Sequence, residues 1–506
     1  MSQVHLQKYV KSAILAASII IVWFFLVGNV GLNLGDEGHL WYGSLQTMKG
    51  AVPILDFRSY DPGRYYWAAG WMRLIGGGIV QLRLAGLIFY GIGLSFILLK
   101  FFKLELRIFY IVSLGVLLIS LSFPIHKLYE YSLTLCAIYF ISECLENSSA
   151  LNSFRYGVFL GISAAFARNF ALYFLISFFL ALAFLKVKRK RPSYWPFVVC
   201  MAVGLAVGIA PIVYMMLFIP GYGSSLFESV RILFGPYAPV LPLSISWRHS
   251  VLVDILYLCI PSFYMFLVIR ALRVSSCCVA ERLLVACAIV GLPILHHVFV
   301  RADLSHLAQG ATPFVVAISI LPMMFRLEKS GYYVRFFSAL VLAIVVAVVG
   351  RVQILPIKEK LREEFVSKSK LAYYPIGLNE ILLDEPRIKY LNTIKALVSK
   401  YESAGDRVWI APYAPGLYPI LEKVDPVWDP YPLFPASEKN QRRMIDDLVR
   451  KKVELVIIDD NALDGINARR FSQTHSIVWH YLMNKYVRVG SAGLEKHEYV
   501  LVSNNH

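Results

Sequence analysis

Charged residues are scarce in this chain of 506 residues. Asp, Glu, Lys and Arg together make up 16% of it, whereas hydrophobic side chains make up 58%. The mean hydropathy is +0.59. A soluble domain does not tolerate so much apolar side chain, and several runs reach the ~20 residues that cross a bilayer. The composition therefore indicates an integral membrane protein and argues against an ordinary soluble enzyme.

Cysteines are few and poorly placed for cross-linking. All seven lie in or beside the apolar part of the chain, and the polar part after about residue 352 has none. The sequence therefore holds no disulfide framework. The adjacent pair Cys277 and Cys278 lacks the further ligands that a metal site needs.

Three sequence motifs of other enzyme classes are missing. The sequence contains no phosphate-binding Walker loop, no HExxH helix and no GxSxG nucleophile turn. Their absence argues against an ATP-driven pump and against a protease.

Acidic residues are outnumbered by basic ones, 33 to 50, which gives a formal net charge of +17. No basic patch with interleaved aromatic residues accompanies this charge, so nucleic acid is not an expected partner. Lys and Arg gather instead in short loops between apolar runs, where they set the orientation of membrane helices. We expect these loops to be cytoplasmic.

The apolar runs predict a membrane domain of about eleven spans. The first run follows Lys8 and Lys11, but it is long for a signal peptide and has a weak cleavage site, so we expect it to remain as a span. The basic clusters fall on one side only if residues 156–186 form a hairpin broken near Arg168 and Asn169. As a single span, the same segment would place the cluster Lys186–Arg191 outside. The expected spans are 12–31, 79–100, 108–125, 128–145, 156–168, 170–186, 194–219, 251–270, 283–300, 311–326 and 334–350.

The composition changes after the last apolar run, which predicts two domains. We expect residues 1–350 to form a transmembrane domain with its N-terminus in the cytoplasm. Residues 351–506 would form a soluble α/β domain on the extracytoplasmic side. Apolar runs at 407–411 and 453–460 flank a helical pattern at 441–451, which favours a strand–helix–strand unit. Segments 487–489 and 499–502 suit a closing hairpin, and the domain would serve as a structural cap or an acceptor-binding module.

The segment after the first span places two carboxylates side by side. Asp36 and Glu37 stand in Gly35-Asp-Glu-Gly-His-Leu-Trp-Tyr42. Adjacent carboxylates at a membrane surface are costly unless they are solvated, paired or used. Asp36 is also suited to cap a helix running from His39 to Lys49, and capping does not exclude catalysis.

A second stretch of the same outer loop mixes charges with aromatic rings. Asp-Pro-Gly at 61–63 favours a tight turn. The stretch from Arg64 to Ile75 is too short to span a membrane, and its Trp and Tyr residues suit a helix in the interface. We therefore expect loop 32–78 to hold two interfacial helices around a turn packed with ionisable groups. The residues that form this turn are Asp56, Arg58, Tyr60, Asp61 and Arg64.

The membrane part of the sequence resembles the GT-C superfamily of membrane glycosyltransferases. The features that carry this resemblance are an Asp-Glu pair directly after the first span, two interfacial helices, a Pro-Gly turn and further spans. Protein mannosyltransferases and aminoarabinose transferases belong to this superfamily. The resemblance covers about residues 1–350. It implies transfer of a sugar from a polyprenyl-phosphate carrier on the outer side of the membrane. It also implies that Asp36 is the catalytic carboxylate and that Glu37 holds the second acidic position. Gly38 and His39 depart from the family, in which Ala or Ser and an aromatic residue often follow the pair, so the subfamily and the sugar stay open.

Sugar transfer from a lipid phosphate needs a base for the acceptor proton and positive charge for the departing phosphate. Asp36 is the candidate base in an inverting single displacement. Arginine suits the phosphate because its fork binds two oxygens at once. The polar stretch Arg301-Ala-Asp-Leu-Ser-His306 either contacts the sugar or phosphate or holds only a local Arg301–Asp303 pair. The expected substrate-binding residues are Glu37, Arg58, Tyr60, Asp61, Arg64, Arg168, Arg301, Asp303 and His306.

The sequence also leads to expectations about metal binding, about binding partners and about alternative functions. We expect no dedicated metal site, although some GT-C enzymes use a divalent cation and His296 and His297 keep that question open. The expected partners are the lipid bilayer, a polyprenyl-phosphate-linked sugar and a glycan, lipid or protein acceptor, in a bacterial inner membrane. A flippase for a lipid-linked glycan would explain the intramembrane Arg83 and Arg168 but not the crowded outer loop. A polymerase of the O-antigen type and a receptor without enzymatic activity are further alternatives.

Overall fold

The structure is a computed structural model that describes residues 3–189, 194–235, 237–238, 240–245, 251–274, 277–322, 330–347, 351–366, 370–401, 405, 407–491 and 497–504. Contacts within the chain divide it into two compact units. Unit 1 comprises Met1–Val27, Arg83–Met215 and Pro242–Leu355, and unit 2 comprises Gly28–Leu82, Met216–Leu241 and Pro356–His506. These units describe packing. The expected division at residue 350 into a membrane part and an aqueous part stays a prediction.

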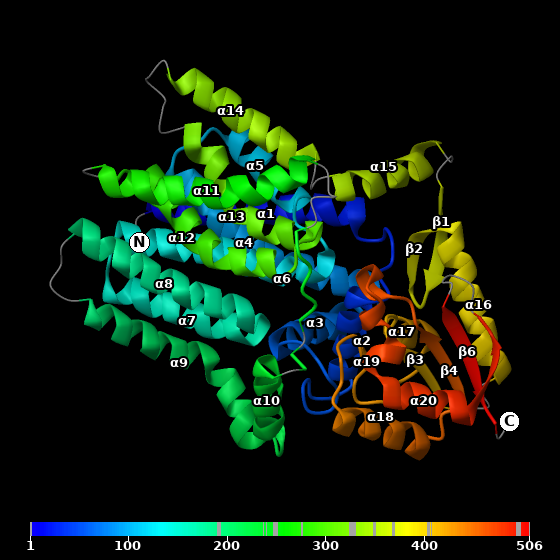
Figure 1. Ribbon diagram of the computed structural model, residues 1–506. Coiled ribbons are helices and arrows are strands. Elements are labelled where there is room, and N and C mark those ends of the chain that lie inside the picture. Colours follow the sequence, from blue (N-terminus) through cyan, green and yellow to red (C-terminus); the bar gives the residue numbers. More distant parts are fainter. Residues whose placement is uncertain are drawn as a thin grey trace. The chain divides into compact units, whose positions relative to one another are not determined.

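Unit 1 is helical, and its centre is α12 (Val279–Val300), which packs against α6, α8, α11 and α13 (Figure 1). Four helices of this unit carry an internal proline, namely α9, α11, α12 and α13. Membrane helices tolerate this because neighbouring groups satisfy the freed carbonyl. The other helices are α1 (Gln3–Val27), α4 (Ile79–Lys103), α5 (Ile108–Ser120), η1 (Ile125–Lys127), α6 (Leu128–Glu146), α7 (Ala150–Phe166), α8 (Arg168–Arg189), α9 (Trp195–Phe218), α11 (Val251–Arg273), α13 (Leu304–Ile320) and α14 (Ser330–Val345).

Each expected span overlaps a helix, although the expected spans 12–31 and 108–125 run past the ends of α1 at Val27 and of α5 at Ser120. Among the residues that the structure describes, six helical stretches are long and apolar enough to cross a membrane: Leu6–Val27, Ile79–Lys103, Arg168–Lys188, Trp195–Phe218, Asp254–Arg273 and Val279–Val300. The pair Ile108–Ser120 and Ile125–Glu146 is bent by 113° and would add a seventh span if it were counted as one. The polytopic helical character is thereby confirmed for the described residues. The count of about eleven spans stays a prediction.

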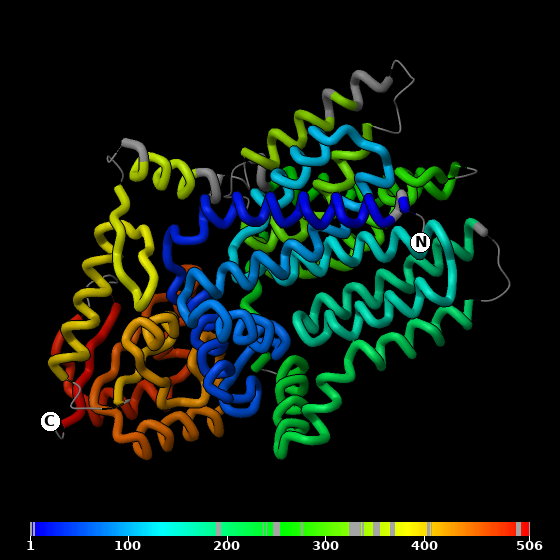
Figure 2. The backbone as a smooth tube through the Cα atoms, turned by 180° about the vertical axis from the view of Figure 1, so that it is seen from behind, coloured from blue at the N-terminus to red at the C-terminus, as the bar shows by residue number. Residues whose placement is uncertain are grey.

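The helical hairpin that the charge distribution required is present. α7 ends at Phe166, Ala167 leaves the helical conformation with φ −159° and ψ 85°, and α8 begins at Arg168. The hydroxyl of Tyr156 donates to the carbonyl of Phe174 at 2.6 Å and ties the two helices together, which Figure 2 shows side by side. The expected break near Arg168 and Asn169 is therefore confirmed to within two residues.

Glycines allow the backbones of α7 and α9 to come into direct contact. A Cβ on Gly161 would lie 2.6 Å from the backbone of Gly208, and one on Gly157 would lie 2.0 Å from the carbonyl oxygen of Met201. Gly157 and Gly161 stand four residues apart, as do Gly204 and Gly208. Small residues at this spacing allow close packing between membrane helices.

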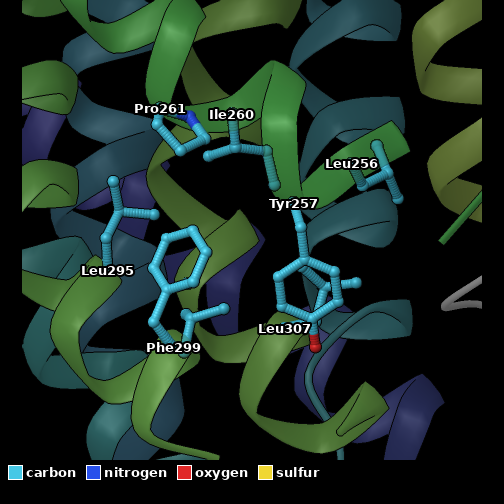
Figure 3. A pocket seen from close by; sticks show the side chains of 9 residues that line it. Leu256, Tyr257, Ile260, Pro261, Leu295, Phe299 and Leu307 are labelled. Atoms are coloured by element: carbon cyan, nitrogen blue, oxygen red, sulfur yellow. The ribbon is translucent and has the colours of Figure 1, made fainter. Parts of the chain in front are cut away.

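A small apolar recess lies between α11, α12 and α13 (Figure 3). Its lining includes the rings of Tyr257 and Phe299, and it has no room for a water molecule. The Tyr257 hydroxyl nevertheless has a partner, since it donates to the carbonyl of Asp303 at 3.3 Å. The recess is therefore part of the apolar packing of unit 1.

Unit 2 contains all the strands and the two helices of the outer loop. It begins with α2 (Asp36–Met48) and α3 (Pro62–Ile75), which pack against each other. Its remaining elements are α10 (Tyr222–Arg231), η2 (Ile232–Phe234), α15 (Arg351–Val366), β1 (Leu371–Ile376), β2 (Asn379–Asp384), α16 (Glu385–Tyr401), β3 (Val408–Ala411), α17 (Leu417–Leu421), α18 (Glu438–Arg450), β4 (Leu455–Asp459), η5 (Leu463–Gly465), η6 (Asn467–Arg469), α19 (Phe471–Thr474), α20 (Ser476–Lys485), β5 (Tyr486–Gly490) and β6 (Glu498–Ser503).

The main sheet has the strand order β3-β4-β6-β5, with β3 and β4 parallel and the other pairs antiparallel. Residues of β3 and β4 are almost all buried because both faces of these strands are covered. One face packs against α18, α19 and α20 through a core that includes Trp409, Val456 and Leu482 (Figure 1). Ser437 begins α18 by accepting a hydrogen bond from the amide of Asn440. The expected strand–helix–strand unit and closing hairpin are confirmed.

A second, two-stranded sheet was not expected from the sequence. β1 and β2 pair in an antiparallel hairpin, and β2 also holds the chain that leads to α2. The amide of Gly31 donates to the carbonyl of Leu382 at 2.9 Å, and the amide of Leu382 donates to the carbonyl of Asn29 at 2.8 Å. The start of the outer loop is therefore fixed by the C-terminal part of unit 2.

Candidate active site

Asp36 occupies the first turn of α2. Gly35 precedes it as the N-cap with φ −81° and ψ −102°, and no side chain caps this helix. The expectation that Asp36 itself caps the helix was therefore wrong, because the helix begins one residue earlier than the apolar pattern suggested. In the first turn its carboxylate still lies near the positive end of the helix dipole, which stabilises negative charge.

Two tyrosine hydroxyls converge on one oxygen of Asp36. Tyr60 lies just before α3 and Tyr431 lies between α17 and α18, and each donates to Oδ1 of Asp36 at 3.5 Å. Burial raises the pKa of both phenols well above the ordinary value, and the charge of Asp36 raises both further. Both hydroxyls therefore keep their protons at physiological pH and act as donors toward the carboxylate.

His39 lies one helical turn after Asp36 and fills the space between the two tyrosines. Its ring stacks on Tyr431, with centroids 5.4 Å apart, and meets the ring of Tyr60 edge-on at 5.1 Å. Burial lowers the pKa of His39 to about 4, while the charges of Asp429 and Asp36 oppose that shift. The ring is therefore neutral at physiological pH and acts as a rigid spacer that holds the tyrosines in place.

Gly38 is required by a close approach of two backbones. A Cβ at Gly38 would lie 2.5 Å from the amide nitrogen of Gly416, a distance that real Cβ contacts do not reach. The amide of Gly416 donates to the carbonyl of Leu34 at 2.9 Å. Gly38 and His39, the two departures from the GT-C pattern, thus both face the C-terminal part of unit 2.

The segment 425–434 closes over the turn between α2 and α3. The guanidinium of Arg58 pairs with the buried carboxylate of Asp429 and lies over the ring of Phe434, 5.7 Å from its centroid. The amide of Arg58 donates to the carbonyl of Trp428 at 2.8 Å, and the indole of Trp428 donates to the carbonyl of Leu55 at 3.0 Å. Arg58 therefore helps to fix the segment that carries Tyr431.

The other expected residues of this loop are also buried in unit 2. The guanidinium of Arg64 lies over the ring of Tyr60, 5.6 Å from its centroid, and is shielded from solvent. Glu37 accepts a hydrogen bond from the amide of Asn33 at 3.4 Å. Asp61 is the N-cap of α3 without a side-chain cap bond, and Pro62 takes the first helical position, which its fixed φ suits. The expected tight turn at Asp-Pro-Gly is therefore the start of a helix.

Unit 1 carries the second expected group, at the start of α13. Arg301 pairs with Asp303 at 2.8 Å, and Nδ1 of His306 lies 2.7 Å from Oδ1 of Asp303. Asp303 also caps α13 by accepting from the amide of His306. Burial raises the pKa of Asp303, but the hydrogen bonds and charge of His306, with the charge of Arg301, bring it down to about 2. The stretch thus contains the local pair that its sequence allowed, and a role in substrate binding stays a prediction.

Three other polar residues that the sequence singled out also lie in unit 1. The ring of His297 lies 4.5 Å from that of His306. The other member of the histidine pair, His296, instead meets the hydroxyl of Tyr173 at 3.0 Å. Arg168 is half-buried at the start of α8. The two adjacent histidines therefore have different partners, as adjacent residues on a helix commonly do.

No group of three or more His, Cys, Asp or Glu side chains is placed to hold a metal ion among the residues that the structure describes. The donors near Asp36 are mainly tyrosine hydroxyls and a neutral histidine, and this set does not fit a tightly held divalent cation.

The sequence pointed to Asp36 and, in the same loop, to Arg58, Tyr60 and Arg64, but not to the residues that approach them from the C-terminal part of unit 2. Tyr431 and Asp429 lie in Asp425-Pro-Val-Trp-Asp-Pro-Tyr431, a stretch dense in proline, aromatic rings and carboxylates. That density, so similar to the composition of the outer loop, was the available signal. His39 was noted only as a departure from the family pattern.

Comparisons with known proteins concern the fold. No protein-family model matches the sequence, and no curated protein matches it. Among solved structures, ArnT from Cupriavidus metallidurans bound to undecaprenyl phosphate is similar with a TM-score of 0.57 and 12% identity, over 96% of this chain and 97% of that one. Its apo structure is similar with a TM-score of 0.56, 12% identity and the same coverage.

A third structure is less similar, the oligosaccharyltransferase of Archaeoglobus fulgidus, with a TM-score of 0.42 and 11% identity over 89% of this chain and 68% of that one. A likeness at that level carries no argument. The similarity to ArnT extends over nearly the whole of both chains and agrees with the resemblance inferred from the outer loop. This chain therefore has a fold similar to that of ArnT over nearly its whole length.

Proposed function

We propose that the protein is a membrane glycosyltransferase that moves a sugar from a polyprenyl-phosphate carrier to an acceptor hydroxyl on the outer face of a bacterial inner membrane. The observation that carries this proposal is the setting of Asp36 in a fold similar to that of ArnT. Its carboxylate stands at a helix N-terminus and receives two tyrosine hydroxyls on one oxygen. The undecaprenyl phosphate bound by ArnT indicates the class of carrier.

The reaction proposed is a single displacement at the anomeric carbon. The acceptor oxygen forms a bond to that carbon as the bond from the carbon to the phosphate oxygen breaks, and the configuration inverts. The electron pair leaves with the phosphate, and the acceptor proton passes to Asp36. Because the leaving group is already a phosphate, no protein acid is needed.

The tyrosines and His39 keep the base in one position. Hydroxyl donors on Oδ1 stabilise the negative charge that a base must carry and fix the plane of the carboxylate. Arg64 is the arginine of unit 2 that we assign to the departing phosphate, since it is buried and its guanidinium lies over the ring of Tyr60, whose hydroxyl contacts Asp36. Glu37, Asp61, Arg168, Arg301, Asp303 and His306 remain proposed substrate-binding residues, as does Arg58.

A transfer assay tests the proposal directly. Purified protein would be supplied with undecaprenyl phosphates that carry radiolabelled sugars, together with membranes of a host that lacks this gene. We expect label to appear in the membrane acceptor, and we expect Asp36→Asn to lower the rate at least a hundredfold. Asp56→Asn is the matched control, because Asp56 is an exposed carboxylate of the same loop.

The results separate the alternatives. A transfer rate in Asp36→Asn equal to that of the parent would contradict the assignment of the base. Movement of labelled lipid across vesicles without transfer would favour a flippase. Extension of a glycan by whole repeat units would favour a polymerase.

A further inference from the structure

A pocket of about 470 Å³ opens within unit 2 beside the segment that carries Asp36. Its volume lies in the range of ligand pockets. It is lined by residues 32–35, by Arg387 and Tyr390 of α16, by the ends of β3 and β4, by Tyr413 and Ala414, and by Glu498. The proposed transfer step uses none of these side chains.

The pocket lies where open α/β sheets bind ligands. Ile410 and Ala411 end β3, and Asp459 ends β4, so the lining includes the carboxyl ends of both parallel strands. Ligands of such sheets bind outside those ends, where the chain turns away from the sheet. Glu498 begins β6 and stands opposite Asp459 in the antiparallel register. Two carboxylates from neighbouring strands therefore meet at one edge of the pocket.

One wall of the pocket is shared with the candidate active site. Gly35 lines the pocket and is followed directly by Asp36. A Cβ at Gly35 would lie 3.0 Å from the hydroxyl of Tyr431 and 3.2 Å from the carbonyl of Tyr413. Tyr431 is one of the two donors to Asp36, and Tyr413 lines the pocket. A ligand in the pocket would thus be separated from Asp36 by a single glycine and its neighbours.

This wall is held at both ends. β2 fixes residues 29–31 through the backbone bonds to Leu382, and Gly416 fixes Leu34. The side chain of Asn33 also accepts a hydrogen bond from the amide of Gly35 at 2.9 Å. The pocket is therefore preformed, which lowers the entropy cost of binding.

The chemistry of the lining selects the class of ligand. Asp459 and Glu498 can accept hydrogen bonds from hydroxyls, and Arg387 can donate them. Tyr390 donates to Glu498 at 2.9 Å and holds it in place. Because the lining has two carboxylates and one arginine, its net charge disfavours binding of a phosphate. The positive charge of the arginine disfavours binding of a bare cation. A neutral sugar ring carries hydroxyls around an apolar face. It therefore matches this mixture of carboxylates, arginine, tyrosines and aliphatic side chains.

We propose that this pocket binds an uncharged, hydroxyl-rich sugar ring next to the site of Asp36. The inference rests on the proposed function and names its substrate class. The ring belongs either to the acceptor or to the sugar carried by the donor. These two sources share one chemistry, and the kinetic measurement below distinguishes them.

The first test measures binding without any transfer. The full chain would be placed in lipid nanodiscs, because glycoside detergents would themselves fill a sugar site. Saturation-transfer NMR would then be recorded with the methyl glycosides of glucose, mannose, galactose and N-acetylglucosamine and with protonated glucosamine. Inorganic phosphate, which has no carbon-bound proton, would be added as a competitor. We expect at least one neutral glycoside to bind.

The variants locate that binding. We expect Ala414→Trp, which fills the pocket, to weaken binding at least tenfold, and we expect Arg387→Ala to weaken it severalfold. Arg387 is half-buried, so its removal does not depend on repacking a core. Arg442→Ala on α18 is the matched control, because Arg442 is exposed and pairs only with Glu438 among the contacts described. Size-exclusion profiles and unfolding temperatures would show that each variant is folded.

Transfer kinetics assign the ring and keep the two proposals apart. A rise in KM for the acceptor alone in Arg387→Ala places the acceptor in the pocket, and a rise in KM for the donor alone places the donor sugar there. Asp36→Asn should still bind the glycoside. Binding that persists while no variant or parent transfers sugar would contradict the proposed function and leave the pocket assigned.

Three results would contradict the proposal that the pocket binds a sugar ring. Absence of binding by every neutral glycoside would overturn it, as would unchanged binding in folded Ala414→Trp. A tenfold preference for phosphate or for protonated glucosamine would overturn it as well. In each case the dependence of transfer on Asp36 would remain a separate result.

Discussion

At the scale of single residues, the surroundings of Asp36 come from parts of the chain that no local pattern connects. Asp36 and Glu37 were visible because they follow a span directly. Tyr431 was not, because it lies 395 residues later and nothing in a single sequence pairs distant residues. His39 shows a different limit. A lone histidine in a helix gives no signal of its own, and its role follows only from the rings that stack on it.

Removing one donor from the carboxylate should lower catalysis. In Tyr431→Phe, Asp36 loses one of its two hydroxyl contacts while the aromatic stack on His39 is retained. A hydrogen bond to a charged group contributes about 1.5 kcal/mol, so we expect kcat to fall about tenfold. The transfer assay measures this, with Tyr486→Phe as control because that hydroxyl bonds a distant carbonyl. Equal rates in Tyr431→Phe and the parent would show that the contact has no role in the reaction.

Two buried histidines should make unit 2 less stable in mild acid. Burial lowers the pKa of His39 and of His475 to about 4 in the folded chain, whereas the unfolded value is 6.5. Between these values the unfolded chain binds more protons, so stability is complete above about pH 6.5 and falls as the pH drops toward 4. Each histidine contributes at most about 3 kcal/mol. Asp429, Asp36, Arg58 and Arg64 are the charges that act on His39, and Asp429 and Arg58 act on His475.

Replacement of each ring isolates its share of this pH dependence. We expect His39→Phe to reduce the fall in unfolding temperature between pH 6.5 and 4.5, and we expect the double variant with His475→Phe to reduce it further. Thermal unfolding in nanodiscs at several pH values provides the measurement. A pH profile that is identical in the parent and the double variant would contradict the assignment.

At the scale of elements, the sequence predicted the structures that leave a periodic pattern of apolar residues. The helices of the outer loop and the strands β3 and β4 followed from such local patterns, whereas the break between α7 and α8 followed from the distribution of Lys and Arg along the whole membrane part. The β1–β2 hairpin was not predicted, because Leu371-Ala-Tyr-Tyr-Pro-Ile376 carries a proline and lacks strict alternation. The close packing of α7 on α9 depends on glycines at matching positions along the two helices. Sequence alone does not reveal which helices pack against each other.

The contact between the α2 N-terminus and residue 416 should not tolerate a methyl group. In Gly38→Ala the new Cβ would lie within 2.6 Å of two backbone atoms of Gly416, and backbone cannot move aside as a flexible side chain can. We expect a loss of about 1–3 kcal/mol in stability and a fall in transfer rate. Thermal unfolding and the transfer assay together measure both effects.

A second helical glycine of the same loop provides the control. Gly70 is exposed in α3, and no atom lies within 4 Å of its position for a Cβ. Gly70→Ala should leave activity unchanged and raise stability slightly, since alanine favours the helix by about 1 kcal/mol. If both variants behaved alike, the close backbone approach would not be what constrains position 38.

At the scale of the whole molecule, the hydrogen bonds within unit 2 constrain the membrane topology. Residues 32–78 bond with residues 416–431, and Gly221 lies near Leu55. Segments in contact stand on the same side of a bilayer, so an even number of spans must separate them. The eleven expected spans satisfy this rule, with six between residues 78 and 220 and ten between residues 78 and 351. A single span at 156–186 would break it.

Accessibility of introduced cysteines checks this topology. In a background without the seven native cysteines, Asp56→Cys and Glu438→Cys should react with a membrane-impermeant maleimide from outside. Arg107→Cys, in an expected cytoplasmic loop, should react only after the membrane is opened. All three positions are exposed. Reaction of Glu438→Cys only from the cytoplasm would overturn both the orientation and the contact.

The distance along the chain between Asp36 and Tyr431 also has a consequence in time. Synthesis proceeds at about 5–20 residues per second, so the 395 residues that separate the two positions take roughly 20–80 s to emerge. Throughout that interval the newly inserted outer loop exposes a carboxylate for which one of the two tyrosine partners, Tyr431, has not been made. A nascent or truncated chain can therefore occupy the membrane without a completed site. Activity would begin only after the last fifth of the polypeptide has been synthesised and has packed against the outer loop, which was inserted first.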